Sequence, residues 1–151
     1  IANSVQQGKR PRSSMAPTIV LNAATGDLEG VVGSPGGSAI IQYTTKAILG
    51  MTDWGLNVQQ AINLPNFGAQ TNATTSIEKG SVIDTAAIRD GLKARGHTVA
   101  QTDTFTSGLH GAVFNGVRSN GNVGLLARNP GAGTYAGGAD PRREGIAQGN
   151  N

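Results

Sequence analysis

Two short apolar segments near the start of the chain predict a β-hairpin. A β-branched run at residues 17–21 is followed by turn-forming residues at Thr25-Gly26-Asp27 and by a second apolar segment at residues 28–32. Apolar runs of this length, separated by a turn that contains glycine, are typical of two paired strands. We therefore expect residues 17–32 to form a hairpin.

Three further segments have apolar residues at helical spacing. They cover residues 39–51, 58–64 and 85–95, and apolar positions three or four residues apart form one buried face on a helix. Residues suited to begin or end a helix flank these segments: Ser38, Asn57 and Asp84 as N-caps, with Pro65 and Gly96 as stops. The spacing predicts three helices, the first of them directly after a glycine-rich stretch.

The remaining strands are predicted mainly in the last third of the chain. They cover residues 97–100, 109–114, 117–118, 123–127 and 134–136, the last ended by Gly137-Gly138, whereas residues 66–76 are expected to form a loop. No internal repeat or long linker divides the sequence. The pattern predicts a single α/β (α+β) domain over residues 1–151, with flexible ends at residues 1–12 and 144–151.

Residues 31–38 form the most informative stretch, in which a strand runs into a helix through a glycine-rich turn. Gly33, Gly36 and Gly37 allow positive φ and close approach of the backbone to a ligand. The helix that follows begins with unpaired N–H groups, which attract negative charge. The stretch has neither the Lys-Ser/Thr pair of a P-loop nor the glycine spacing of a dinucleotide-binding turn. It is interpreted as an anion or oxyanion receptor, with a purely structural tight turn as the alternative.

A second candidate is the serine pair Ser13-Ser14, which lies between the basic run at residues 9–12 and the first predicted strand. Serines in a loop are commonly only solvated. Two adjacent hydroxyls can nevertheless donate hydrogen bonds to a carboxylate, and the basic run favours anions. The pair is therefore a candidate carboxylate site.

Composition and charge narrow the classes of function. The chain has 151 residues, a net charge of +3 and a pI of about 9.7, but only 4% of its residues are aromatic. Proteins that bind single-stranded nucleic acid combine basic grooves with stacking aromatic rings. Here the aromatic residues do not alternate with the basic clusters at residues 9–12 and 142–143, which argues against nucleic-acid binding. No apolar run approaches the roughly 20 residues of a membrane span.

Several kinds of catalytic centre are also disfavoured. The absence of cysteine excludes disulfides, thiolate zinc sites and a cysteine nucleophile. His97 and His110 have no metal-ligand spacing to each other or to carboxylates, so both are expected to be structural or exposed, and no metal site is predicted. The charged residues 140–144 follow turn-forming glycines and are expected to form a solvated loop with weak local ion pairs.

Five stretches, in the same order along the chain, resemble the small subunit of gamma-glutamyltranspeptidases. They are residues 9–18 (KRPRSSMAPT), 33–38 (GSPGGS), 55–58 (GLNV), 77–80 (IEKG) and 138–142 (GADPR). The resemblance covers nearly the whole chain, and residues 101–134 match least well.

The resemblance implies an N-terminal-nucleophile hydrolase, in which this chain forms part of a four-layer αββα sandwich with mostly antiparallel strands and about three helices. In this family a precursor cuts itself, and the new N-terminal Thr of the small subunit attacks the gamma-glutamyl amide of glutathione or a related compound. The gamma-glutamyl group then passes from the enzyme to water or to an amino acid. The resemblance implies no cofactor.

The resemblance also assigns roles to the two candidate motifs. It implies that Ser13 and Ser14 hold the α-carboxylate of the substrate, and that the N–H groups of Gly36 and Gly37 form the oxyanion hole. One position departs from the family pattern, because Arg12 stands where the family often has Leu.

The family's catalytic Thr opens the small subunit well upstream of the serine pair, whereas this sequence begins at Ile1, a short loop ahead of Ser13. We therefore expect a C-terminal portion of the small subunit that lacks the nucleophile and is inactive alone. Its expected partners are the large subunit and the N-terminal part of the small subunit, and the resemblance implies a periplasmic or extracellular location. The alternatives are a non-catalytic module that binds an anion or glutamate, and a purely structural domain.

Overall fold

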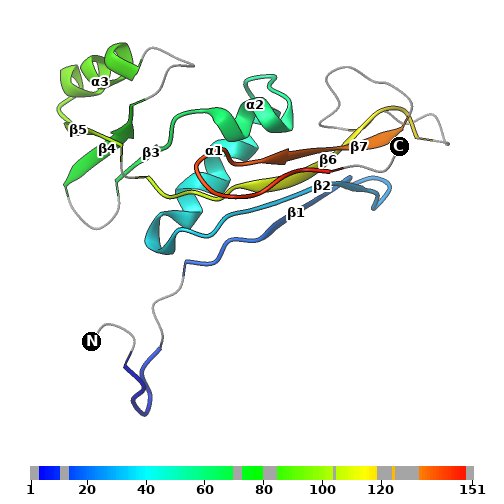
Figure 1. The fold of residues 1–151 in the computed structure, drawn as a ribbon, viewed down its shortest axis with the longest axis horizontal. Coiled ribbons are helices and arrows are strands. Elements are labelled where there is room, and N and C mark those ends of the chain that lie inside the picture. The colour runs from blue at the N-terminus through cyan, green and yellow to red at the C-terminus, as the bar shows by residue number, and fades with distance from the viewer. Residues whose placement is uncertain are drawn as a thin grey trace.

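The computed structural model describes residues 4–10, 14–69, 73–79, 85–103, 105–118, 124 and 133–148. The elements are, in order, β1 (Thr18–Leu21), β2 (Leu28–Gly33), the 3₁₀ helix η1 (Gly37–Ala39), α1 (Ile40–Thr52), α2 (Val58–Asn63), β3 (Phe67–Gly68), β4 (Thr74–Glu78), α3 (Thr85–Ala94), β5 (Thr98–Thr102), β6 (His110–Asn115) and β7 (Thr134–Ala139). They form a four-stranded sheet and a three-stranded sheet (Figure 1). The predicted α/β class is confirmed.

The four-stranded sheet has the order β1-β2-β6-β7, and all its neighbouring strands are antiparallel. The predicted hairpin is confirmed, with Thr18 opposite Val32. Its turn forms because the Asn22 side chain accepts hydrogen bonds from the N–H groups of Ala24 and Thr25, and Gly26 supplies a φ of +75°.

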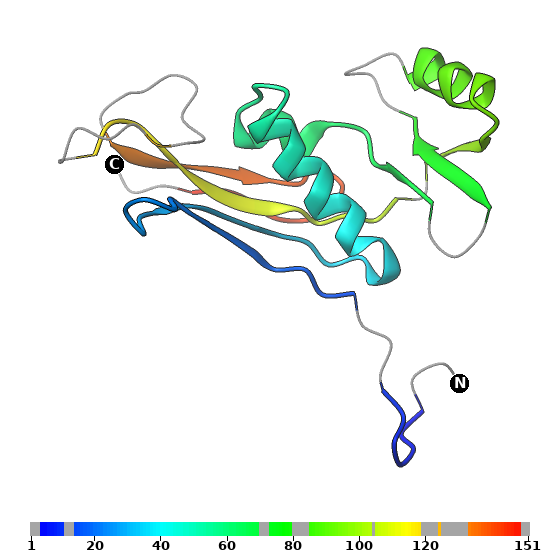
Figure 2. The same ribbon diagram turned by 180° about the vertical axis from the view of Figure 1, so that it is seen from behind.

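Helices α1 and α2 cover one face of this sheet, and the hydrophobic core lies between them and the strands (Figure 2). Core residues from each layer include Val32 of β2, Tyr43 and Met51 of α1, Ile62 of α2 and Val113 of β6. The two helices approach closely at Gly50, where a Cβ atom would lie 2.9 Å from the Cβ of Ala61. The small residues of this pair thus set the distance between the helices.

The two helix starts differ from each other in how they are capped. Asn57 caps α2, as the sequence predicts, and the structure adds a capping box with Gln60. Ser38 does not cap α1, and this prediction was wrong. Because Ser38 lies within η1, the N-cap of α1 is Ala39, and no side chain caps it.

The three-stranded sheet has the order β3-β4-β5. Strands β4 and β5 are parallel and are connected through α3, whereas β3 and β4 are antiparallel. The prediction of a loop over residues 66–76 was therefore wrong in part, because Phe67 and Gly68 gain strand partners only in the folded chain. Helix α3 is confirmed, and its predicted cap Asp84 lies outside the described residues.

The last strand is longer than the sequence predicts. Strand β7 continues through Gly137 and Gly138, which pair with Ala112 and Gly111 of β6. Glycine is needed at the second position, because a Cβ on Gly138 would lie 2.8 Å from Cδ1 of Ile62 in α2. Gly138 thus allows α2 to pack on the strand, and neither glycine ends it.

Two remaining strand predictions concern residues 117–127. Val117 makes only an isolated β-bridge, and residues 123 and 125–127 lie outside the described residues. In the described part of the chain, no helix is both long enough and apolar enough to cross a membrane.

Candidate functional site

The glycine turn, defined here as residues 34–37, connects β2 to η1 and α1. Gly36 has a φ of 138° and Gly37 a φ of 60°, conformations that L side chains rarely adopt. A Cβ on Gly36 would lie 2.5 Å from Cε2 of Tyr43, whereas a Cβ on Gly37 would meet nothing within 4 Å. The first glycine is thus required by both space and conformation, and the second by conformation alone.

The N–H groups of Gly36 and Gly37 have no hydrogen-bond acceptor among the described residues. Their carbonyl groups are occupied, because the Gly36 carbonyl accepts from the N–H of Ala39 and the Gly37 carbonyl accepts from the N–H of Ile40. The 13-residue helix α1 follows directly, and a helix N-terminus carries partial positive charge. The turn can therefore stabilise an anion or a developing oxyanion with two backbone donors.

Residues 105–109 lie against the glycine turn. Ser34 Oγ accepts a hydrogen bond from the Gly108 N–H at 3.1 Å and donates to the Pro35 carbonyl at 2.6 Å. Tyr43, which closes the space beside Gly36, packs edge-to-face on Phe105 with 6.0 Å between ring centroids. Burial raises the pKa of the Tyr43 phenol, so the ring supports the turn as a neutral group at physiological pH.

The predicted serine pair is only partly described, because Ser13 lies outside the described residues. Ser14 is half-buried and precedes β1. A Cβ on Gly33 at the end of β2 would lie 4.0 Å from the Cα of Pro17. Ser14 is three residues from Pro17, which is at most about 10 Å of extended chain. The hairpin register thus places Ser14 and the glycine turn at the same end of the sheet.

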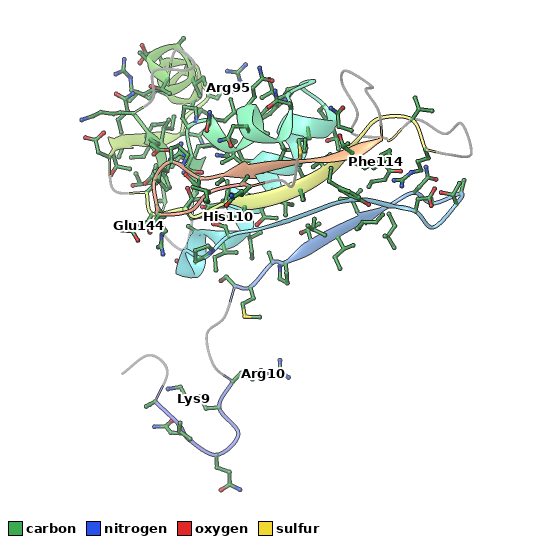
Figure 3. The ribbon with its side chains drawn as sticks, turned by 45° about the vertical axis from the view of Figure 1, so that its right-hand side comes forward. Lys9, Arg10, Arg95, His110, Phe114 and Glu144 are labelled. Atoms are coloured by element: carbon green, nitrogen blue, oxygen red, sulfur yellow. The ribbon has the colours of Figure 1, made fainter. Side chains whose placement is uncertain are left out.

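Only Lys9 and Arg10 of the basic run that precedes the serines are among the described residues. Lys9 and Arg10 lie on a segment that extends away from both sheets (Figure 3). The Nζ atom of Lys9 donates to Ser4 Oγ at 3.1 Å. These two cations therefore do not contribute to the charge around the glycine turn in this structure.

A buried ionic cluster, which the sequence did not predict, consists of Lys46, Glu78, Asp140 and Arg142. Arg142 Nε lies 2.6 Å from Glu78 Oε1, and Arg142 Nη1 lies 3.0 Å from Asp140 Oδ1. Lys46 Nζ donates to the carbonyls of Ile62 and Leu64. Asp140 is only 1% exposed, so the prediction of a solvated loop was wrong for Asp140 and Arg142. Pro141, Arg143 and Glu144 are exposed, as that prediction expects.

The Asp140 carboxylate is held from both sides. Its Oδ2 atom accepts from Ser107 Oγ at 2.6 Å and from the Leu109 N–H at 3.0 Å, while Oδ1 accepts from the Arg142 N–H. Burial alone would raise its pKa, but these hydrogen bonds and that of the Arg142 side chain lower it overall. Asp140 is therefore an ionised anchor for the backbone around it.

A signal for this anchor exists in the sequence. Asp140 directly follows Ala139, the last residue of β7, which pairs with His110 at the start of β6. A strand that continues through Gly137 and Gly138 places Asp140 beside the start of β6, whereas a strand that ends at Ala136 leaves Asp140 in a loop.

The two histidines are exposed, as predicted. His110 lies at the opposite end of β6 from Phe114 (Figure 3), and its Nδ1 atom is 3.0 Å from the Gly108 carbonyl oxygen. Within the described ranges, no group of three or more His, Cys, Asp or Glu residues could hold a metal ion.

Comparison with known proteins bears on this site. The family profile of gamma-glutamyltranspeptidase matches residues 1–150. The chain is 41% identical to the glutathione hydrolase proenzyme of Escherichia coli over 107 residues, which are 70% of this chain and 18% of that protein. It is 31% identical to the glutathione hydrolase proenzyme of Bacillus subtilis over 150 residues, which are 99% of this chain and 22% of that protein.

A solved structure of gamma-glutamyltranspeptidase from Helicobacter pylori resembles this one with a TM-score of 0.72 at 30% identity, over 94% of this chain and 68% of that chain. The chain therefore shares its mixed α/β fold with solved gamma-glutamyltranspeptidases. The chain spans only about a fifth of the length of the two curated relatives.

Proposed function

The chain belongs to the gamma-glutamyltranspeptidase family, and we propose that it supplies the oxyanion hole of an enzyme that transfers or hydrolyses the gamma-glutamyl group of glutathione and related amides. The observation that carries this proposal is the pair of N–H groups on Gly36 and Gly37, for which the described residues offer no acceptor. Two such donors match the charge that develops when a carbonyl is attacked.

In the proposed reaction, a Thr hydroxyl supplied by another part of the enzyme attacks the γ-carbonyl carbon. The carbonyl π electrons move to oxygen, and the N–H groups of Gly36 and Gly37 donate to the resulting oxyanion. The C–N bond then breaks, the amine leaves with a proton, and a gamma-glutamyl ester remains. Water or the amine of an amino acid attacks this ester and regenerates the Thr hydroxyl. Interior residues such as Thr18 and Thr44 are not proposed as nucleophiles, because they have no free α-amine to act as base.

We further propose that Ser13 and Ser14 hold the α-carboxylate of the gamma-glutamyl group. The position of Ser14 at the same end of the sheet as the glycine turn supports this role. A carboxylate held there would fix the substrate at its far end while the turn receives the carbonyl oxygen.

The partners of this chain are proposed from the open face of the four-stranded sheet. Helices α1 and α2 cover the opposite face, while Ile19 and Leu21 of β1 are 67% and 55% exposed and Val31 of β2 is 39% exposed. Ile19 and Val31 are paired neighbours, so these side chains form a contiguous apolar surface. We propose that the large subunit and the rest of the small subunit cover it, and that the chain alone is inactive.

A double substitution in the full-length enzyme tests this function. Ser13→Ala with Ser14→Ala is expected to raise the KM for a chromogenic gamma-glutamyl anilide at least about tenfold, because the hydroxyls bind substrate and transition state alike. Ser76→Ala in β4 is the matched control and is expected to leave the KM unchanged. Initial rates over a range of substrate concentrations give both constants.

Three outcomes would contradict the proposal. An unchanged KM in the double variant would remove the serines from the carboxylate site. Release of the anilide leaving group by the purified 151-residue chain would show that the nucleophile does not come from elsewhere. Binding of glutamate without any turnover by the full-length enzyme would favour a non-catalytic module.

A further inference from the structure

We propose that Ser34 and Asp140 are positioning residues for the glycine turn, acting through residues 107–109, which lie between them. The inference rests on the proposed function of the turn as an oxyanion hole. Through this path the two residues fix the direction of the Gly36 N–H. Neither residue needs to touch the substrate for this role.

The first link is the Asp140 carboxylate, which fixes both residues that flank Gly108. Oδ2 accepts from Ser107 Oγ at 2.6 Å and from the Leu109 N–H at 3.0 Å. The other oxygen is bound by Arg142, so the carboxylate cannot rotate freely. Since Ser107 and Leu109 are themselves fully buried, the backbone around Gly108 has one well-defined position.

The second link is Gly108, which packs directly on the turn. A Cβ atom on Gly108 would lie 2.9 Å from Cγ of Pro35 and 2.9 Å from Cδ of Arg143. Its carbonyl oxygen lies 3.0 Å from Nδ1 of His110, and its N–H donates to Ser34 Oγ at 3.1 Å. Both the carbonyl and the N–H of Gly108 thus have partners, and the N–H binds the turn.

The third link is the Ser34 hydroxyl, which orients the peptide group between Pro35 and Gly36. Because Ser34 Oγ accepts the Gly108 N–H, its single proton is available for the Pro35 carbonyl oxygen, 2.6 Å away. The C=O of a trans peptide points opposite to the N–H of the same planar unit. Fixing the Pro35 oxygen therefore fixes the direction in which the Gly36 N–H points.

Substitutions of Ser34 in the full-length processed enzyme test the inference. Ser34→Ala is expected to lower kcat about ten- to hundredfold, since misplacement by about 1 Å can cost that much, with KM changed less than about twofold. Ser34→Thr keeps the hydroxyl and is expected to recover most of kcat. Ser76→Ala serves as the matched control. Rates are normalised to the amount of cleaved small subunit on a gel.

A double-mutant cycle tests whether Asp140 acts through the same path. Asp140→Asn is expected to lower kcat in the same direction, and the Ser34→Ala/Asp140→Asn double variant is expected to lose little more than Ser34→Ala alone. Full additivity of the two losses would show that Asp140 does not act through Ser34. If Asp140→Asn does not fold, the pair Ser34→Ala and Ser34→Thr decides the inference by itself.

Failure of this inference can be distinguished from failure of the proposed function. If Gly36→Ala lowers kcat but Ser34→Ala does not, the turn is an oxyanion hole and Ser34 does not position it. If the loss in Ser34→Ala is not recovered by Ser34→Thr, the hydroxyl path is wrong. If Gly36→Ala leaves kcat unchanged, the oxyanion role of the turn itself is wrong.

Discussion

The glycine turn and the buried ionic cluster lie on neighbouring segments but differ in whether their polar groups have hydrogen-bond partners. In the turn, two backbone N–H groups have no acceptor among the described residues. In the cluster, the carboxylate of Asp140 and the guanidinium of Arg142 are bonded on several sides. The first arrangement is ready to receive a ligand, whereas the second is complete without one.

Burial explains why each arrangement is stable. Gly37 is exposed and Gly36 is half-buried, so water can solvate their N–H groups until a substrate displaces it. Asp140 is 1% exposed and forms an ion pair with Arg142, and removing one partner from a buried ion pair typically costs about 3–5 kcal/mol. Unpaired donors are therefore tolerated at the solvated turn but not in the buried cluster. Their presence at the turn favours a role in binding.

The largest expected effect comes from Gly36→Ala, which displaces the glycine turn. The new Cβ would lie 2.5 Å from Tyr43, at a φ of 138°, so the turn must move. We expect kcat of the full-length enzyme to fall at least about 10²-fold, as when an oxyanion donor is lost. Steady-state kinetics check this, and a kcat within threefold of wild type would contradict it.

A smaller effect is expected for Gly37→Ala, which separates backbone strain from chemistry. Gly37 and Gly55 have φ values of 60° and 70°, and a Cβ at either position meets nothing within 4 Å. Both alanine variants carry the same left-handed strain of about 1–2 kcal/mol. We expect kcat to fall severalfold in Gly37→Ala and to stay at the wild-type value in Gly55→Ala. Equal kcat values in the two variants would place the turn outside the chemistry.

The smallest expected effect concerns Lys46, which belongs to the buried ionic cluster. Burial, and next the charge of Arg142, lower the pKa of Lys46 to about 7. Above that pH the folded state has lost a proton that the unfolded state keeps up to about pH 10. Stability contributed by this group therefore rises with pH between about 7 and 10, by at most about 1.4 kcal/mol per pH unit.

Replacing Lys46 by methionine tests this sign. Lys46→Met removes this titrating group and is therefore expected to flatten the rise in the thermal midpoint between pH 7 and pH 9. The carbonyls of Ile62 and Leu64 keep a donor in this variant, because Arg142 also binds them. Lys79→Met removes an exposed lysine and should keep the wild-type slope. A slope in Lys46→Met equal to that of wild type would show that Lys46 keeps its proton when folded.

Local signals in the sequence were sufficient for much of the fold. The β1–β2 hairpin, the N-cap at Asn57 and the end of α2 before Pro65 all depend on neighbouring residues. Strand β3 could not be predicted in this way, because Phe67 becomes a strand residue only by pairing with Ile77. Strand β7 was cut short because glycine usually ends a strand, whereas Gly138 makes room for Ile62.

The candidate site divides along the same line. The sequence predicts the glycine turn because its glycines and the helix that follows them are contiguous in the chain. Its support was not visible, since Ser34 and Gly108 are 74 residues apart. Asp140 was missed because its burial depends on the position of β7. The roles of Ser13 and Ser14 stay predictions, and Ser13 lies outside the described residues.

Residues 105–109 connect the small sheet to the large one, since β5 precedes them and β6 follows them. The same residues lie against the glycine turn. A rotation of the small sheet relative to the large sheet would therefore be transmitted along this segment to the peptide groups of the turn. Substitutions in α3 or β5 that change the average angle between the sheets are expected to alter turnover without altering any group that meets the substrate.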